Sequence, residues 1–256
     1  MSFRDLLFLV LFFLILLFAS LSETGAAERT LVGPFPYLSR ADSPFDLSGL
    51  GSTFFLEDFE SGAIASLGLR LYGNATAVVR GPGDFTDSVD GDDGEIDGLG
   101  TAGHSLLDAG GVVFLPTGIP VFIRDIGFQF DSTQLGFLPT VFGFVWTDGH
   151  QDSFVGILTW NADGERTADE FRGRVGDTSR LGETSEDRFF GITRADGISR
   201  VLVRTLVEGA DSLFEIDHVQ YGLIIPEASA EVMLLSGIFS ACVLSLTQKR
   251  SCKKGT

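Results

Sequence analysis

Short runs of apolar or alternating residues recur through the middle of the chain, separated by turns rich in glycine and aspartate. Alternation with a period of two is typical of β-strands, and no long stretch has the period of an amphipathic helix. The runs that we predict as strands are 53–59, 67–72, 76–80, 112–115, 121–130 with a break near Asp125, 140–146, 154–160, 188–193, 199–207 and 212–221. This pattern predicts an all-β chain folded as a β-sandwich, with the domain spanning residues 52–222.

The alternation is clearest in residues 200–204, where Val201 and Val203 fall on one face and the arginines at both ends of the segment fall on the other. Residues 28–51 are rich in Pro, Ser and Gly and show no sustained period, so we predict a linker there. The polar, glycine-punctuated stretch 173–187 is predicted to be a long loop within the same domain.

The charge of the body is strongly negative. Residues 28–225 hold 13 arginines and no lysine against 31 acidic residues, a net charge of −18. Such a body repels nucleic acid, which we therefore exclude as a partner. Both cysteines, Cys242 and Cys252, lie in the C-terminal tail, so the domain has no disulfide and no thiolate metal site.

Acidic residues are densest in the segment DSVDGDDGEIDG, residues 87–98. Several carboxylates on one glycine-rich loop are the ligands that calcium prefers, although the spacing is not that of an EF-hand. Two interpretations stay open, a calcium site and a solvated acidic turn. The candidate ligands in this loop are Asp87, Asp90, Asp92, Asp93 and Asp97, with Glu95 among the same carboxylates.

The two tryptophans are candidates for glycan contact, because sugar faces stack on exposed aromatic rings. Trp146 and Trp160 each end a predicted strand beside Asp, Asn or Gly residues, a position that suits a binding site at the edge of a loop. The alternative for each is a core tryptophan.

Catalytic motifs are weak throughout. The match of residues 98–103 to G-x-G-x-x-G follows an anionic loop that would repel phosphate, so we discount a nucleotide site. His104, His150 and His218 form no metal-binding pair and are expected to be structural. A glycosidase needs two positioned carboxylates, which a chain this acidic supplies by chance, so no catalytic residue is assigned.

The N-terminus carries 14 uninterrupted apolar residues, 6–19, preceded by Arg4 and followed by a polar stretch with Gly25 and Ala27. This length suits the core of a secretion signal, and we predict a signal peptide over residues 1–27 that is cut before Glu28. Export would then use the Sec translocon and signal peptidase. The alternative is an uncleaved N-terminal anchor.

The C-terminal tail, residues 224–256, has three parts: Pro226-Glu227-Ala228, an apolar run 232–246, and a basic end made of Lys249, Arg250, Lys253 and Lys254. The run of 15 residues spans about 22 Å as a helix, a marginal transmembrane span, and its basic end should stay cytoplasmic. A helix packed on the domain is the alternative. The tail resembles the PEP-CTERM sorting signal, with Ala228 in place of the family's second proline. The resemblance implies an exosortase as processing partner, transient anchoring in the inner membrane, and delivery to the cell envelope or extracellular matrix.

The start and end of the predicted domain, FLEDFESG (55–62) and FEIDHVQYG (214–222), resemble carbohydrate-binding modules and related extracellular jelly rolls. The resemblance implies a jelly-roll sandwich whose first and last strands lie close together and share a structural calcium ion. Glu60, or Asp58, and Asp217 are the residues that match. We therefore expect an exported, non-enzymatic protein that binds or is embedded in extracellular polysaccharide. The alternatives are a structural surface protein without a specific ligand and a secreted glycoside hydrolase.

Overall fold

The computed structural model describes residues 29–37, 39–45, 53–73, 77–89, 101–108, 111–114, 120–149, 154–171, 187–207 and 214–224. For residues 111–114, 120–123, 154, 170, 206 and 207 only the backbone is described. The strands are β1 (Arg29–Pro36), β2 (Thr53–Glu57), β3 (Leu69–Leu71), β4 (Val78–Arg80), β5 (Ser105–Leu107), β6 (Gly111–Phe114), β7 (Pro120–Phe130), β8 (Val141–Asp148), β9 (Phe154–Trp160), β10 (Arg166–Phe171), β11 (Arg188–Arg194), β12 (Arg200–Val207) and β13 (Glu215–Leu223). Two short helical turns, η1 (Arg40–Asp42) and α2 (Ser132–Leu135), accompany them.

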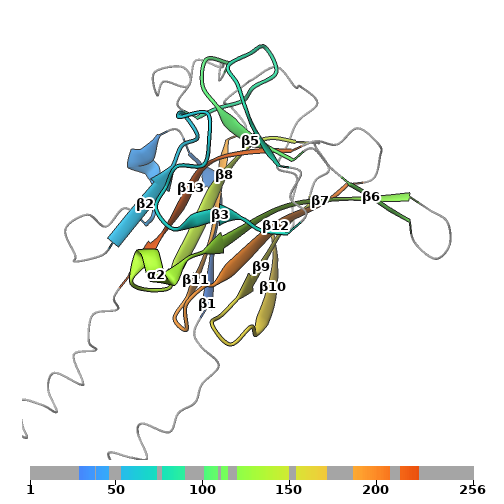
Figure 1. The fold of residues 1–256 in the computed structure, drawn as a ribbon. Helices are drawn as coiled ribbons and strands as arrows, with labels where there is room; N and C mark the ends of the chain where they lie inside the picture. The colour runs from blue at the N-terminus through green and yellow to red at the C-terminus, as the bar shows by residue number, and fades with distance from the viewer. Residues whose placement is uncertain are drawn as a thin grey trace, which may run out of the picture. The chain divides into compact units, whose positions relative to one another are not determined.

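These strands form two antiparallel sheets (Figure 1). Sheet A has the order β1-β11-β8-β13-β5-β4, and β2 also pairs with β13. Sheet B has the order β10-β9-β12-β7-β3, and β6 also pairs with β7. The described part of the chain is therefore nearly all β, as the sequence predicts.

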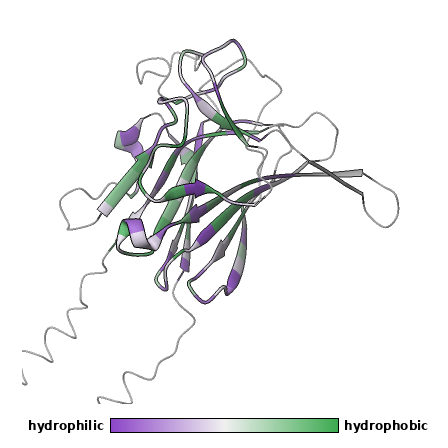
Figure 2. Ribbon diagram, viewed as in Figure 1, coloured by the Kyte–Doolittle hydropathy of each residue, from purple (hydrophilic) through white to green (hydrophobic). Residues whose placement is uncertain are grey.

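Phenylalanines from both sheets meet in one core. Phe142 of β8 lies against Phe128 and Phe130 of β7, with ring centroids 5.8 and 6.2 Å apart. Farther along the core, the ring centroids of Phe171 in β10 and Phe190 in β11 lie 4.9 Å apart. Figure 2 shows hydrophobic and hydrophilic positions alternating along the strands, as expected when one face of each sheet is buried. The two sheets thus pack face to face as a β-sandwich.

Part of the second face of sheet A, around Phe189, is covered by rings from the N-terminal stretch 29–45, whose first residues form the edge strand β1. Phe189 of β11 is fully buried there, with ring centroids 5.4 Å from Phe35, 5.8 Å from Tyr37 and 5.4 Å from Phe45. The Tyr37 hydroxyl also accepts a hydrogen bond of 2.9 Å from the Gln220 side chain of β13. The prediction of a linker over residues 28–51 is therefore wrong for this stretch, which supplies an edge strand and part of a second apolar layer.

Each of the ten predicted runs overlaps a strand, and β9 has the predicted bounds. The break expected near Asp125 is absent, because β7 pairs with β12 without interruption through this residue. Strands β1, β5 and β10 were not predicted. The first and last predicted strands do lie side by side, since Glu57 of β2 is opposite Val219 of β13.

Several predicted features lie outside the described residues. They are the signal peptide 1–27 with its cut, most of the loop 173–187, the sorting motif Pro226, Glu227 and Ala228, the apolar run 232–246 and the basic end 249–254. Within the ranges that are described, no helix is long and apolar enough to cross a membrane.

Candidate functional site

Sheet B turns one face to the core and the other, which we call the outer face, away from it. Val201 and Val203 of β12 are fully buried against the core. Arg200, Leu202 and Arg204 alternate with them and are partly exposed. The alternation predicted for residues 200–204 is thus confirmed, and it fixes which residues of the neighbouring strands lie on the outer face.

One line of side chains crosses five of the six strands of sheet B, from β10 to β3. Trp160, the last residue of β9, is directly opposite Arg166 of β10 on one side and Arg200 of β12 on the other. The line continues through Gln129 of β7 to Arg70 of β3. Residues directly opposite each other in antiparallel strands point to the same face, so these five side chains form a continuous row. We call it the Trp160 row.

Two members of the row, Trp160 and Arg200, form an aromatic–arginine cluster with Tyr72, which lies beside the row at the end of β3. The Arg200 guanidinium carbon lies 4.9 Å from the ring centroid of Tyr72 and 5.2 Å from that of Trp160. The two rings are tilted by 58° with centroids 6.3 Å apart. Arg200 also donates a 2.8 Å hydrogen bond to the Tyr72 hydroxyl. Cation–π contacts and this hydrogen bond together fix the position of the guanidinium.

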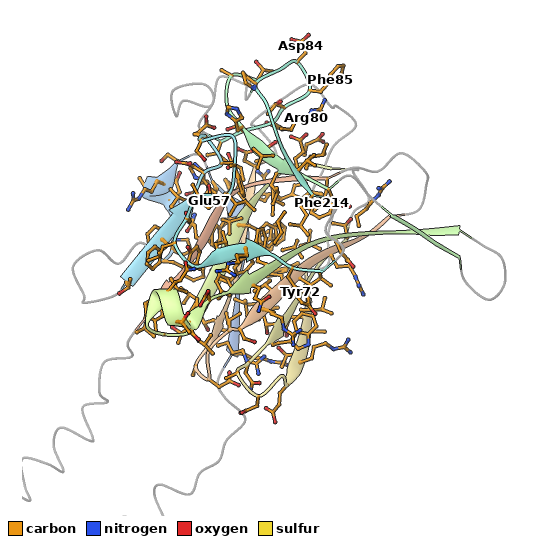
Figure 3. All side chains as sticks on the ribbon, in the orientation of Figure 1. Glu57, Tyr72, Arg80, Asp84, Phe85 and Phe214 are labelled. Carbon is orange, nitrogen blue, oxygen red and sulfur yellow. The ribbon has the colours of Figure 1, made fainter. Side chains whose placement is uncertain are left out.

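The backbone beneath the cluster holds its members in place. The Trp160 carbonyl accepts hydrogen bonds from the Ser199 N–H at 2.7 Å and the Ser199 hydroxyl at 3.0 Å. Tyr72, which directly follows β3 and is labelled in Figure 3, donates its N–H to the Gly127 carbonyl at 2.8 Å. A side chain at Gly127 would meet the Tyr72 carbonyl oxygen at 2.5 Å, so glycine is required for this close approach. The cluster therefore stands on paired strands rather than on a loop.

Two further arginines of the outer face are neutralised by carboxylates. Arg204 forms a bidentate pair with Asp125 of β7, at 2.7 and 2.8 Å, and this hydrogen bonding raises the pKa of Arg204. Arg70 donates to Asp131 at 2.9 Å. Asp131 also accepts from the Thr133 hydroxyl and from the N–H groups of Thr133 and Gln134 in α2, and these bonds lower its pKa.

Arg166 and Arg200 differ from these two. Neither forms an ion pair with a carboxylate in the part of the chain that the structure describes. Both stand directly beside Trp160 in the row. The Trp160 ring of this acidic protein is therefore flanked by two guanidinium groups without a carboxylate partner among the described residues, Arg166 on one side and Arg200 on the other.

Trp146 does not share this position. It is fully buried in β8 and its ring stacks on Phe214 at 5.2 Å, with an angle of 6° between the planes. Its ring cannot reach a glycan, so the expectation for Trp146 is corrected: it is a core tryptophan. Trp160, which is half-buried on the outer face, keeps its place as a predicted contact.

The carboxylates that were predicted to share calcium lie on the other sheet. The single Ser88 hydroxyl proton is shared between two carboxylates, those of Asp217 of β13 at 3.1 Å and of Glu60, just after β2, at 3.3 Å. Asp217 also accepts the N–H groups of Val89 and His218, and Glu60 accepts the N–H of His104. Glu60 and Asp217 are thus brought together, as the resemblance implies, but Ser88 lies between them.

A second buried carboxylate lies beside this pair. Glu215 of β13 accepts hydrogen bonds from the Asp87 N–H at 3.0 Å and the Ser105 hydroxyl at 2.8 Å, and Arg80 approaches it to 3.6 Å. Figure 3 labels Arg80 where β4 ends. Burial outweighs these favourable contacts and raises the pKa of Glu215 to about 7.

No three His, Cys, Asp or Glu side chains within the described ranges are arranged to hold a metal ion. The carboxylates of Glu60 and Asp217 are engaged by protein donors, and Asp87 is buried beside Glu215. Asp90, Asp92, Asp93 and Asp97 lie outside the described residues. The residues in view do not form a calcium site by themselves, and the calcium prediction depends on the remainder of the acidic loop.

Sequence reasoning missed Tyr72, Arg166 and Arg200 as site residues. Tyr72 ended a predicted strand, and Arg200 was placed on the outward face of another. What the sequence lacks is the pairing that brings β3, β9 and β12 into one sheet. Without that pairing, nothing connects residues 72, 160 and 200.

No protein-family model and no curated protein matches the sequence. Among solved structures, the chain is similar to TmCBM61 in complex with beta-1,4-galactotriose, at 14% identity and a TM-score of 0.36 over 66% of this chain and 95% of that one. It is similar to the K1 cleaved adhesin domain of Lys-gingipain from Porphyromonas gingivalis W83, at 13% identity and a TM-score of 0.38, covering 66% and 97%. A third is the C-terminal family 22 carbohydrate binding module of Clostridium thermocellum Xyn10B, at 12% identity and a TM-score of 0.37, covering 70% and 98%. These likenesses are too slight to assign a ligand, and the sandwich architecture rests on the strand pairing and core contacts of this chain.

Proposed function

We propose that this protein is a non-catalytic polysaccharide-binding domain and that its ligand lies on the outer face of sheet B. The observation that carries the proposal is the aromatic–arginine cluster of Tyr72, Trp160 and Arg200, which is held on paired strands and is partly open to solvent. Aromatic rings offer apolar surface to the C–H faces of sugars, while nearby polar groups hydrogen-bond to hydroxyls. Gln129, exposed in the same row, supplies both a donor and an acceptor.

The test is the binding of soluble polysaccharides to the purified full chain, measured by affinity electrophoresis and calorimetry. Trp160→Ala should abolish retardation, because it removes the principal ring, and Tyr72→Ala should weaken it. Phe85→Ala is the matched control: Phe85 is 55% exposed but lies in the loop after β4 of sheet A. A Trp160→Ala variant that folds and still binds as the parent does would refute the site. A parent that binds no glycan would favour a structural surface protein without a ligand.

We also propose that the domain is exported and sorted to the cell envelope, with the tail processed by an exosortase-type enzyme. The support is the order of Pro226-Glu227-Ala228, the apolar run and the basic end in the sequence. Removing Lys249–Thr256 or replacing Glu227 should leave the tail uncleaved in the host, which immunoblotting of cell fractions would show. Unchanged size and location of both variants would contradict this role.

Calcium remains a proposal for residues 87–98 together with Glu60 and Asp217. An ion bound only by the folded state must raise its stability. Thermal unfolding in millimolar calcium, with magnesium as the control, should therefore show a higher midpoint than in chelator. An unchanged midpoint would show that the segment is a solvated acidic turn.

A further inference from the structure

The Trp160 row has a charge pattern that is unexpected for this chain. The body is strongly acidic, yet the row contains three arginines, and Arg70 alone among them is paired with a carboxylate within the described residues. Arg166 is exposed and Arg200 is half-buried. The row is thus a local positive strip on an acidic protein.

The position of these two arginines relative to the aromatic ring points to a ligand class. Arg166 and Arg200 flank Trp160 on its two neighbouring strands, so their backbones are about 10 Å apart, twice the spacing between strands. A sugar stacked on Trp160 would therefore have a guanidinium group on either side. Neutral hydroxyls do not need a full positive charge, whereas a carboxylate or sulfate matches the fork of a guanidinium.

The geometry points to an acidic polysaccharide, whose sugar rings carry carboxylates, as the ligand of the Trp160 row. This inference rests on the proposed function and specifies its substrate class. Arg200 would act as the main anion contact, because Tyr72 and Trp160 hold its guanidinium in place before the ligand arrives. Arg166 would add a second, more mobile contact.

The net negative charge of the protein does not prevent this interaction. At physiological ionic strength the Debye length is about 8 Å, so carboxylates on other faces are largely screened from a polymer lying along the row. Contacts at hydrogen-bond distance are screened much less. The acidic body then disfavours non-specific polyanion binding and leaves the row as the place where an anionic chain is accepted.

The experiment compares each polyuronate with its own neutral form. Polygalacturonate, alginate and a glucuronate-bearing xylan are each tested before and after chemical reduction of their carboxyl groups to alcohols, against the purified full chain at 0.15 M salt. At least one native polymer should bind tenfold or more tightly than its reduced form. Dextran sulfate beside dextran shows whether sulfate is accepted too, and an oligothymidylate shows whether any flexible polyanion is.

Variants separate charge from stacking. Arg200→Gln should bring the affinity for the native polymer down to that for the reduced one, and Arg200→Lys should restore part of the difference. Trp160→Ala should reduce binding to both forms. Arg40→Gln is the matched control, since Arg40 also stacks on a ring, that of Phe54, but lies beside sheet A. The midpoint of thermal unfolding of each variant verifies that it is folded.

The outcomes separate this inference from the function beneath it. Equal affinity for native and reduced polymers would overturn the acidic ligand while leaving polysaccharide binding in place. Binding of oligothymidylate as tight as that of the best polyuronate would also overturn it, in favour of a general polyanion site. Loss of all binding in Arg200→Gln, including binding to reduced polymers, would assign Arg200 to holding the rings rather than to recognising charge. Absence of binding to every glycan would refute the proposed function, and this inference with it.

Discussion

Replacing Glu215 by glutamine should remove a large pH dependence from the stability of the domain. Burial raises the pKa of this carboxyl from its ordinary 4.5 to about 7. One pKa unit corresponds to about 1.4 kcal/mol, so ionising Glu215 in the folded protein costs about 3 kcal/mol more than in the unfolded chain. The stabilisation by the protonated group is fully present below pH 4.5, decreases as the pH rises, and is lost above pH 7.

Glutamine keeps the shape of the protonated side chain and an oxygen that can accept from the Asp87 N–H and the Ser105 hydroxyl. It never ionises near Asp148, whose charge also raises the pKa of Glu215, although Arg80 opposes this effect. The variant should therefore match the parent near pH 4 and be about 3 kcal/mol more stable at pH 7.5. Urea unfolding followed by tryptophan fluorescence between pH 4 and 8 measures the difference, in which titrating groups that do not interact with Glu215 cancel.

Asp196 provides a control of opposite sign. Hydrogen bonds from Arg194, at 2.6 and 2.8 Å, are the main cause that lowers the pKa of Asp196. Its contribution to stability is present above the ordinary pKa of a carboxyl and is lost as the pH falls through the lowered value. The difference between parent and Asp196→Asn should therefore shrink towards low pH. Parallel curves for the parent and Glu215→Gln across the whole range would refute the reasoning about Glu215.

Two packing predictions test the layer over sheet A. Phe189→Ala should destabilise the domain by roughly 3–5 kcal/mol, because the ring is fully buried among three others. Phe85→Ala, which removes a largely exposed ring, should cost less than about 1 kcal/mol of stability. Urea unfolding compares the two variants, and similar losses of stability would show that the layer is not packed as described. Gly143→Ala should lower the stability by about 1–3 kcal/mol, since the new methyl group would lie 2.3 Å from the Phe189 ring. Gly156→Ala should leave the stability nearly unchanged, because its methyl group would meet no atom nearer than 3.7 Å. An unchanged midpoint of thermal unfolding for Gly143→Ala would contradict the contact with Phe189.

The strands that sequence analysis missed are mainly those at the edges of the sheets. Among the described strands, β1, which contains Pro34 and Pro36, has β11 as its single partner, and β10, which contains Arg166, Asp169 and Glu170, has β9 as its single partner. Edge strands tolerate proline and charged residues because one side of the backbone makes no ladder hydrogen bonds, so an edge strand can lack the apolar pattern of inner strands, as β1 and β10 do. β5, with three residues, is too short to show a period. The inner strands, which are rich in Phe, Val and Ile, were found because burial imposes that pattern.

The candidate site shows a different limit. Trp146 and Trp160 each end or nearly end a strand and are followed by polar residues, so the local sequence treats them alike. β8 is buried on both faces, because the core covers one and Phe45 and Phe189 pack over Gly143 on the other, and its alternation therefore does not reveal which way Trp146 points. For Trp160 the deciding fact is its pairing with Arg200, whose orientation the alternation in β12 does reveal. A ring becomes a candidate for binding here only through the register of its neighbour, which is a long-range property that local patterns do not contain.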